Sequence, residues 1–105
     1  MRRVNEVIRE VLAAAIATDL KDPRIGFVTI THVETSPDLR AARVYVSVLG
    51  SAEERERTLA GLRSAHGFLQ SRINSELRMK RTPTLSFDYD DSLERGARIS
   101  ELMEE

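Results

Sequence analysis

The stretch that decides the fold is Leu59–Met79, which reads LAGLRSAHGFLQSRINSELRM. It holds two apolar stripes at helical spacing, the first at Leu59 and Leu62, the second at Leu69, Ile73 and Leu77. Two helices are therefore expected. Between them, Gly67 costs about 1 kcal/mol against alanine inside a helix, so we predict that it ends one helix and redirects the next. Such a junction either offers backbone N–H groups to an anion or is a plain corner, and the stretch by itself leaves both open.

Composition indicates one globular domain over residues 1–105. Of the 105 residues, 41% are hydrophobic and 31% charged, which suits a single core. The absence of cysteine excludes disulfides, thiolate metal sites and cysteine nucleophiles. No apolar run approaches the roughly 20 residues of a membrane span, and the charged N-terminus lacks the apolar part of a secretory signal. We therefore expect a cytoplasmic protein that makes no membrane contact.

The net charge of −1 conceals an uneven distribution of charge. From Asp88 onward, seven acidic residues accompany two basic ones, which gives that part −5. The preceding part holds fourteen basic and ten acidic residues, or +4. Between Arg63 and Arg81, five basic residues accompany the single acid Glu76. Because local potential decides where a polyanion settles, the central helical pair is predicted to be the electropositive part of the molecule.

The first half of the chain predicts a helix followed by a β-hairpin. Apolar residues recur at three- and four-residue steps from Met1 to Leu20, and Pro23 ends that helix. Residues 27–34 are rich in β-branched side chains and predict a strand with Val28 and Ile30 on one side and Phe27, Thr29 and Val33 on the other. A turn at 36–38 leads to a second strand over 41–49, whose buried face is expected to hold Ala42, Val44, Val46 and Val48.

The second half predicts two helices, a strand and a final helix. Ser51 and Glu54 fit a capping box that opens a helix running to Ser64. The next helix is expected from about Gly67 to Met79, stopped by Thr82-Pro83. A strand at 84–89 then places on one face Leu85, Phe87 and Tyr89. A short helix from Asp90 follows, with a weak apolar side of Leu93, Ala97, Leu102 and Met103. This predicts an α+β fold in which helices cover one face of a three-stranded sheet.

The order α-β-β-α-α-β is that of the type II KH domain, a nucleic-acid-binding fold. In that fold a GxxG loop between the two middle helices clamps the backbone of a single strand. This chain has the Ala-x-Gly kink Ala65-His66-Gly67 in its place. Together with further segments, this kink resembles bacterial ribosome-binding factor A over almost the whole chain. Those segments are KDPRIGFV (21–28), SPDL (36–39), ARVYVS (42–47) and DDS (90–92).

This resemblance implies a KH-like domain that acts as a non-enzymatic assembly factor. Members of that family bind the free small (30S) ribosomal subunit and its 16S ribosomal RNA. They assist late maturation of this RNA, including its 5′ end, and matter most in the cold. The expected partners are thus the small subunit and its RNA, with GTPase assembly factors as a candidate class that the sequence leaves open. A monomer with no cofactor, catalytic residue or metal ion is expected.

The RNA-binding surface is predicted on the kink and the wet face of the following helix. At about 100° per residue, the face opposite the apolar stripe carries Gly67, Ser71, Ser75 and Arg78, with Arg72 on its flank. Small hydroxyls beside arginines suit phosphate and ribose oxygens. The candidate residues are Arg63, Ser64, Ala65, His66, Gly67, Ser71, Arg72, Ser75, Arg78, Lys80 and Arg81.

Other interpretations of these residues remain open. A solvated helix face shows the same serines and arginines, so the alternative is a protein-interaction module that docks through the open sheet face or the first helix. His66 either contacts RNA or is simply exposed at the turn. Phe68 and Met79 either stack on a base or pack against the first helix, as most apolar flank residues do.

An acidic cluster near the end of the chain admits a magnesium-dependent nuclease as a further interpretation. It comprises Asp88, Asp90 and Asp91, and carboxylate oxygens are the ligands that Mg²⁺ prefers. However, the cluster falls at a strand-to-helix turn, where aspartates serve as caps, and the sequence offers no evident companion base. We therefore expect caps rather than metal ligands.

Overall fold

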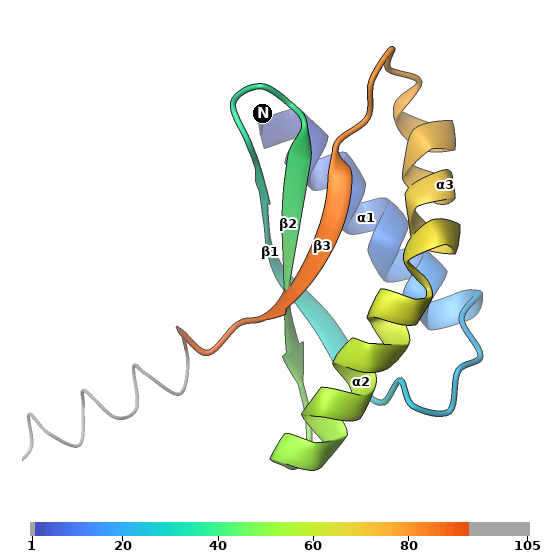
Figure 1. The fold of residues 1–105 in the computed structure, drawn as a ribbon, viewed down its shortest axis with the longest axis vertical. Helices are drawn as coiled ribbons and strands as arrows, with labels where there is room; N and C mark the ends of the chain where they lie inside the picture. The colour runs from blue at the N-terminus through green and yellow to red at the C-terminus, as the bar shows by residue number, and fades with distance from the viewer. Residues whose placement is uncertain (1, 93–105) are drawn as a thin grey trace, which may run out of the picture.

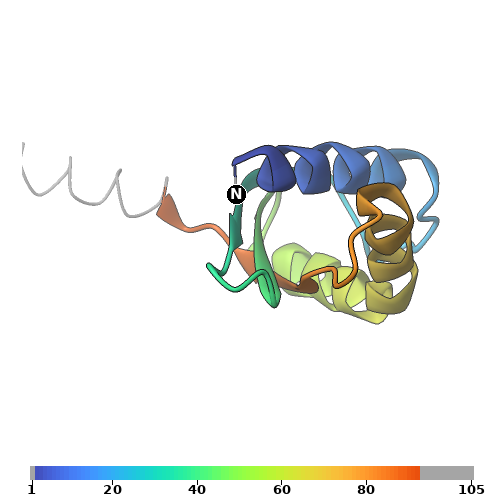
Figure 2. The ribbon, with the colours of Figure 1, turned by 90° about the horizontal axis from the view of Figure 1, so that it is seen from above.

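The computed structural model describes residues 2–92, in which three helices lie on one side of a three-stranded sheet (Figures 1 and 2). β1 runs antiparallel to β2, and β2 runs parallel to β3, so the strand order is β1-β2-β3. The predicted α+β, KH-like order of elements is confirmed. The bounds are α1 Arg2–Thr18, β1 Val28–Thr35, β2 Ala41–Val48, α2 Ala52–Ser64, α3 His66–Leu77 and β3 Thr84–Tyr89.

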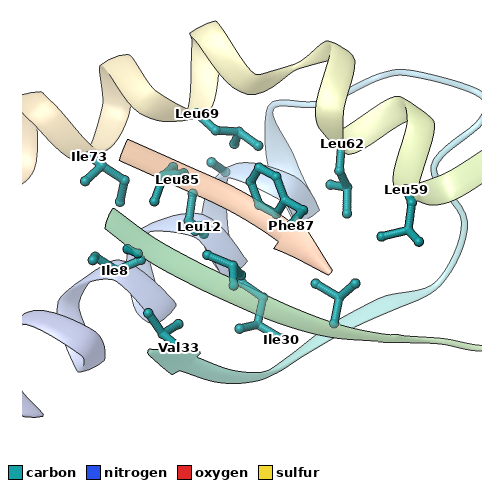
Figure 3. Packing of buried hydrophobic residues seen from close by; sticks show 14 of the residues in the cluster. Ile8, Leu12, Ile30, Val33, Leu59, Leu62, Leu69, Ile73, Leu85 and Phe87 are labelled. Atoms are coloured by element: carbon teal, nitrogen blue, oxygen red, sulfur yellow. The ribbon is translucent and has the colours of Figure 1, made fainter. Parts of the chain in front are cut away.

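The core lies between the sheet and the helices (Figure 3). Leu69 and Ile73 of α3 are fully buried, as the four-residue stripe predicts, and Leu59 and Leu62 of α2 are buried beside them. Strand β2 contributes its predicted alternate set of Ala42, Val44, Val46 and Val48. Periodicity therefore identified the buried faces of both middle helices and of the central strand.

Strand β1 departs from the predicted alternation because it contains a β-bulge. Its pairing with β2 shifts register between Ile30 and His32, which leaves Thr31 as an extra residue. An extra residue reverses the alternation beyond it, so Ile30 and Val33 both face the core, at 5% and 4% exposure. The prediction that these two side chains lie on opposite sides was wrong. A bulge is defined by pairing with another strand, which the sequence of β1 does not display.

Two helices end earlier than predicted. α1 ends at Thr18 rather than Leu20. α3 ends at Leu77 rather than Met79, because Arg78 adopts the left-handed conformation, with φ 50° and ψ 37°, that terminates many helices. The proline expected to stop α3 lies several residues beyond its observed end.

The capping box predicted at the start of α2 is confirmed. The N–H of Glu54 donates to Ser51 Oγ at 3.2 Å, and the N–H of Ser51 donates to Glu54 Oε1 at 3.3 Å. The predicted strand at 84–89 is likewise confirmed as β3. The final helix predicted from Asp90, with its apolar side from Leu93 onward, lies outside the described residues. Within residues 2–92, no helix is both long and apolar enough to span a membrane.

Candidate nucleic-acid interface

The junction between α2 and α3 is a single residue, Ala65. Its dihedrals are φ −86° and ψ 9°, and its N–H bonds to the carbonyls of Gly61 and Leu62, both at 3.1 Å. Its own carbonyl accepts the N–H of Leu69 at 3.0 Å, which starts the hydrogen-bond pattern of α3. The prediction that Gly67 makes the bend was wrong, because the bend lies at Ala65. The φ of Ala65 is negative, so the bend does not require a glycine.

Gly67 instead lies inside α3 with an ordinary helical backbone and no positive φ. A Cβ placed on it would meet no atom within 4 Å. Neither the fold nor the bend therefore requires glycine here. What glycine provides is an unobstructed patch of backbone on the exposed face at the start of α3.

The exposed face of α3 carries the residues that the helical spacing predicts. Ser71, Ser75 and Arg78 are all exposed, on the side of the helix opposite Leu69 and Ile73. Within residues 2–92 these three side chains make no hydrogen bond or ion pair. Their hydroxyl and guanidinium groups are thus available to an external ligand.

Arg72, predicted on the flank of α3, is held by α1. Its guanidinium forms an ion pair with the carboxylate of Asp19, just after the end of α1, and lies 5.6 Å from the ring centroid of Phe68. Phe68 is 45% exposed, so about half of its side chain remains accessible to solvent. The guanidinium stacks on this ring and so shields its face, an arrangement worth about 0.5–1 kcal/mol at an exposed site.

His66 ties the start of α3 to the sheet. Its Nε2 lies 2.8 Å from the carbonyl oxygen of Leu85 in β3, and the side chain is half-buried. Because a carbonyl only accepts, the ring must carry its proton on Nε2. The expectation of a simply exposed histidine was wrong, and the bonded nitrogen is not available to RNA.

Arg63 is also engaged with β3. It donates to the carbonyl of Phe87 at 2.8 Å and lies 3.7 Å from Asp88, which in turn lies 3.3 Å from Arg43. Asp88 therefore lies within ion-pair distance of both Arg43 and Arg63. Asp90 accepts the hydroxyl of Thr31 at 2.6 Å and, like a cap, the N–H of Ser92 at 2.9 Å. In the described part of the chain, no group of three His, Cys, Asp or Glu residues is placed to hold a metal ion.

The turn from α3 to β3 is positioned by Gln70 and Asn74, which the sequence analysis did not single out. Gln70 donates to the carbonyl of Pro83 at 2.8 Å and accepts the N–H of Leu85 at 2.8 Å. Asn74 bonds to Gln70 and accepts the hydroxyl of Thr82. Their spacing of four residues on one helix face was the available signal. These bonds fix the turn at 78–83 beside the end of α3.

The turn also carries Lys80 and Arg81. Like Arg78, both are exposed and form no ion pair within residues 2–92. The charge of Arg81 nevertheless acts on a neighbouring loop. Hydrogen bonds from the Ser36 hydroxyl and the Arg40 amide, with a smaller contribution from Arg81, lower the pKa of the Asp38 carboxyl.

The eleven predicted residues thus fall into two groups. Arg63, His66 and Arg72 are occupied by the protein itself, and Ala65 is half-buried at the junction. The remaining seven are exposed at the end of α2, along α3 and in the turn beyond it: Ser64, Gly67, Ser71, Ser75, Arg78, Lys80 and Arg81. The twelve residues of α3 span about 18 Å, with the glycine near one end and the cations at the other.

The chain matches one protein family and resembles several solved structures. The family described as ribosome-binding factor A matches residues 1–103. A Thermotoga maritima protein, proposed to be a ribosome-binding factor A and solved by solution NMR, is 38% identical; the match covers 87% of each chain with a TM-score of 0.77. The crystal structure of ribosome-binding factor A from Thermus thermophilus is 28% identical, over 84% of this chain and 92% of that one, with a TM-score of 0.74.

A third similar structure concerns a complex. It is a homology model of the Thermus thermophilus factor, fitted into a cryo-EM map of that factor with the 30S subunit. It is 29% identical to this chain, covers 83% of this chain and 91% of its own, and gives a TM-score of 0.67.

Proposed function

We propose that this chain, which belongs to the ribosome-binding factor A family, binds the small ribosomal subunit through its 16S RNA and assists subunit assembly. The match over residues 1–103 and the likeness to a factor fitted into a 30S complex support this. The assistance concerns late maturation of the RNA, including its 5′ end, and matters most in the cold. The protein acts as a monomer and by binding, without a catalytic step. GTPase assembly factors are the class of further partner that fits such a role.

The observation that carries this proposal is the row of unpaired cations and hydroxyls along α3 and its following turn. Arg78, Lys80 and Arg81 are exposed and form no ion pair in the described chain. Ser71 and Ser75 precede them on α3. Cations that keep no internal partner lose little on meeting a phosphate. Phosphate contacts carry no base information, so the surface reads the shape and backbone of the RNA.

The proposal is tested by sedimentation of a cell extract through a sucrose gradient. We expect the protein in the fractions of free small subunits and its depletion from polysomes, because an assembly factor must leave before translation begins. Immunoblotting across the gradient measures this distribution. Equal occupancy of small subunits, whole ribosomes and polysomes would contradict the assembly role.

Gly67→Ala is expected to stabilise the protein and to weaken its binding to small subunits. The free energy of unfolding should rise by up to about 1 kcal/mol, since the position is helical and a methyl meets no atom. Binding should weaken because that methyl would occupy the surface against which an RNA backbone lies. Circular dichroism melts and binding isotherms with isolated subunits measure the two effects. Unchanged affinity in the stabilised variant would show that the RNA lies elsewhere.

A further inference from the structure

We propose that the free edge of β1 and the facing side of α1 form a docking groove for an extended, acidic segment of a partner protein, which adds to the sheet as a further strand. The groove has a volume of about 520 Å³ and lies between α1 and residues 25–30. Within the described chain, none of the predicted RNA-binding residues lines it. The site is therefore separate from the proposed RNA surface, and both can be occupied together.

The backbone of β1 supplies the first argument. β1 is an outer strand, and the N–H of Leu49 donates to the carbonyl of Phe27 at 3.1 Å, so these two form a hydrogen-bonded pair. Bonded and non-bonded pairs alternate in an antiparallel ladder, and Val28 and Ile30 are therefore non-bonded positions. Their N–H and C=O groups therefore point away from β2, along the free edge of the sheet. An extended peptide satisfies such groups by continuing the sheet.

The bulge at Thr31 limits how much strand can be added. A regular edge is available only up to Ile30, because the register shift that follows twists the strand and interrupts the ladder. The edge thus provides two donors and two acceptors, from Val28 and Ile30. A short segment fits this edge, whereas a long strand, as in an aggregating sheet, does not.

The side chains of the groove select the segment. The α1 wall presents the small exposed Ala13 and Ala17, which leave room for side chains, and Ile16 lies half-buried between them. On the strand side Phe27 lines the groove and is 79% exposed. Its pairing partner Leu49, which does not line the groove, is 77% exposed. Large apolar side chains exposed side by side commonly mark an interaction site. The side chains of an added strand alternate between the two faces of the sheet. One set would contact the α1 wall, and the other would lie on the face that carries Phe27.

The charge of the groove decides among possible occupants. Of its described lining residues Arg9 alone is charged, and it forms no ion pair within residues 2–92. A carboxylate on the incoming segment would supply that pair. A second copy of this chain pairing through its own β1 edge would bring only Phe27, Val28, Thr29 and Ile30, none acidic, and would leave Arg9 unpaired. RNA has phosphates for Arg9 but no strand backbone for the edge, so a protein segment is favoured.

The test uses a synthetic probe and the whole protein labelled with ¹⁵N. The probe is a capped peptide of about seven residues that alternates valine with threonine and carries one aspartate. We expect the amide signals of Val28 and Ile30 to shift and their hydrogen exchange to slow as peptide is added. The same peptide with all of its amides N-methylated has no N–H donor on either edge and methyl groups along both, so it should not bind. Equal binding of both peptides, absence of shifts at these two amides, or dimerisation of the free protein through β1 would each overturn the proposal.

A matched pair of variants locates the site. Ala13→Glu fills the groove and places a carboxylate four residues from Arg9, so we expect a loss of about tenfold or more in peptide affinity. Ala14→Glu makes the same change at the next exposed residue, which does not line the groove, and should bind like the parent. Both should bind small subunits normally, which separates failure here from failure of the proposed RNA interface. Equal peptide affinities of the two variants would contradict the assignment.

Discussion

Replacing Arg78, Lys80 and Arg81 together by glutamine is expected to weaken binding to the small subunit about 50-fold at about 0.15 M salt. Each phosphate contact with single-stranded RNA contributes about −0.7 to the slope of log affinity against log salt. Three contacts give a slope of about −2, and this slope, taken from a reference of about 1 M salt, corresponds to the stated loss. Binding titrations of isolated subunits over a salt series measure both quantities.

The slope of the parent protein distinguishes two states of the interface. If Arg63 and Arg72 keep their partners in the sheet and at Asp19, the parent slope should be about −2. If both side chains turn to RNA, all five cations give about −3.5. The geometry favours the shallower slope of about −2, because Arg63 and Arg72 would have to give up interactions that they already make in the free protein.

A control with the same change of charge distinguishes local contacts from net charge. Arg3 and Arg9 lie on α1 and Arg57 lies on α2, so none of the three belongs to α3 or its following turn. Their joint replacement by glutamine should change affinity by less than about threefold, since distant charges are largely screened at this salt concentration. Equal losses in the two triple variants would mean that overall charge, rather than the α3 surface, drives binding.

Arg78 also allows stability and binding to be separated within one residue. Its left-handed conformation costs an L-residue about 1–2 kcal/mol, which glycine does not pay. Arg78→Gly should therefore raise the free energy of unfolding by about 1 kcal/mol while reducing the salt slope by about 0.7. A more stable protein that binds less well cannot be explained by partial unfolding.

Gly61→Ala is expected to lower the free energy of unfolding by about 1–2 kcal/mol. A Cβ at this position would lie 2.7 Å from Cγ1 of Ile25, in the loop that crosses α2. That loop cannot easily retreat, because Thr58, 1% exposed, accepts the N–H of Gly26 at 3.2 Å and donates to the carbonyl of Arg24 at 3.3 Å. Overpacking of up to about 3 kcal/mol should outweigh the roughly 1 kcal/mol that alanine gains in helix propensity.

The matched control is Gly67→Ala, the same substitution in the neighbouring helix. It should move the melting temperature upward, whereas Gly61→Ala should move it downward by about 4–8 °C per kcal/mol. Circular dichroism melts of both variants under one set of conditions decide the matter. Shifts of the same sign would show that the packing around Gly61 does not govern its tolerance.

Features that depend on local periodicity and local capping could be predicted from the order of residues. The alternation of β2, the capping box of Ser51 and Glu54, and the stripe of Leu69 and Ile73 all follow from neighbours within one or two turns. The exposed face of α3 was predictable for the same reason, because the direction of one helix face fixes the opposite one. These features were sufficient for the order of elements and for most of the candidate surface.

Which of those surface residues are free to act depends instead on contacts between distant parts of the chain. Asp19 and Arg72 are fifty-three residues apart along the chain, and His66 and Leu85 nineteen, so no local pattern relates them. The bulge at Thr31 likewise exists only against β2. Burial of the apolar stripes brings these distant groups together, and the contacts that result satisfy some polar side chains and leave others to solvent. These long-range contacts explain why Arg63 and Arg72 are engaged within the protein, whereas the cations at 78–81 form no ion pair in the described chain.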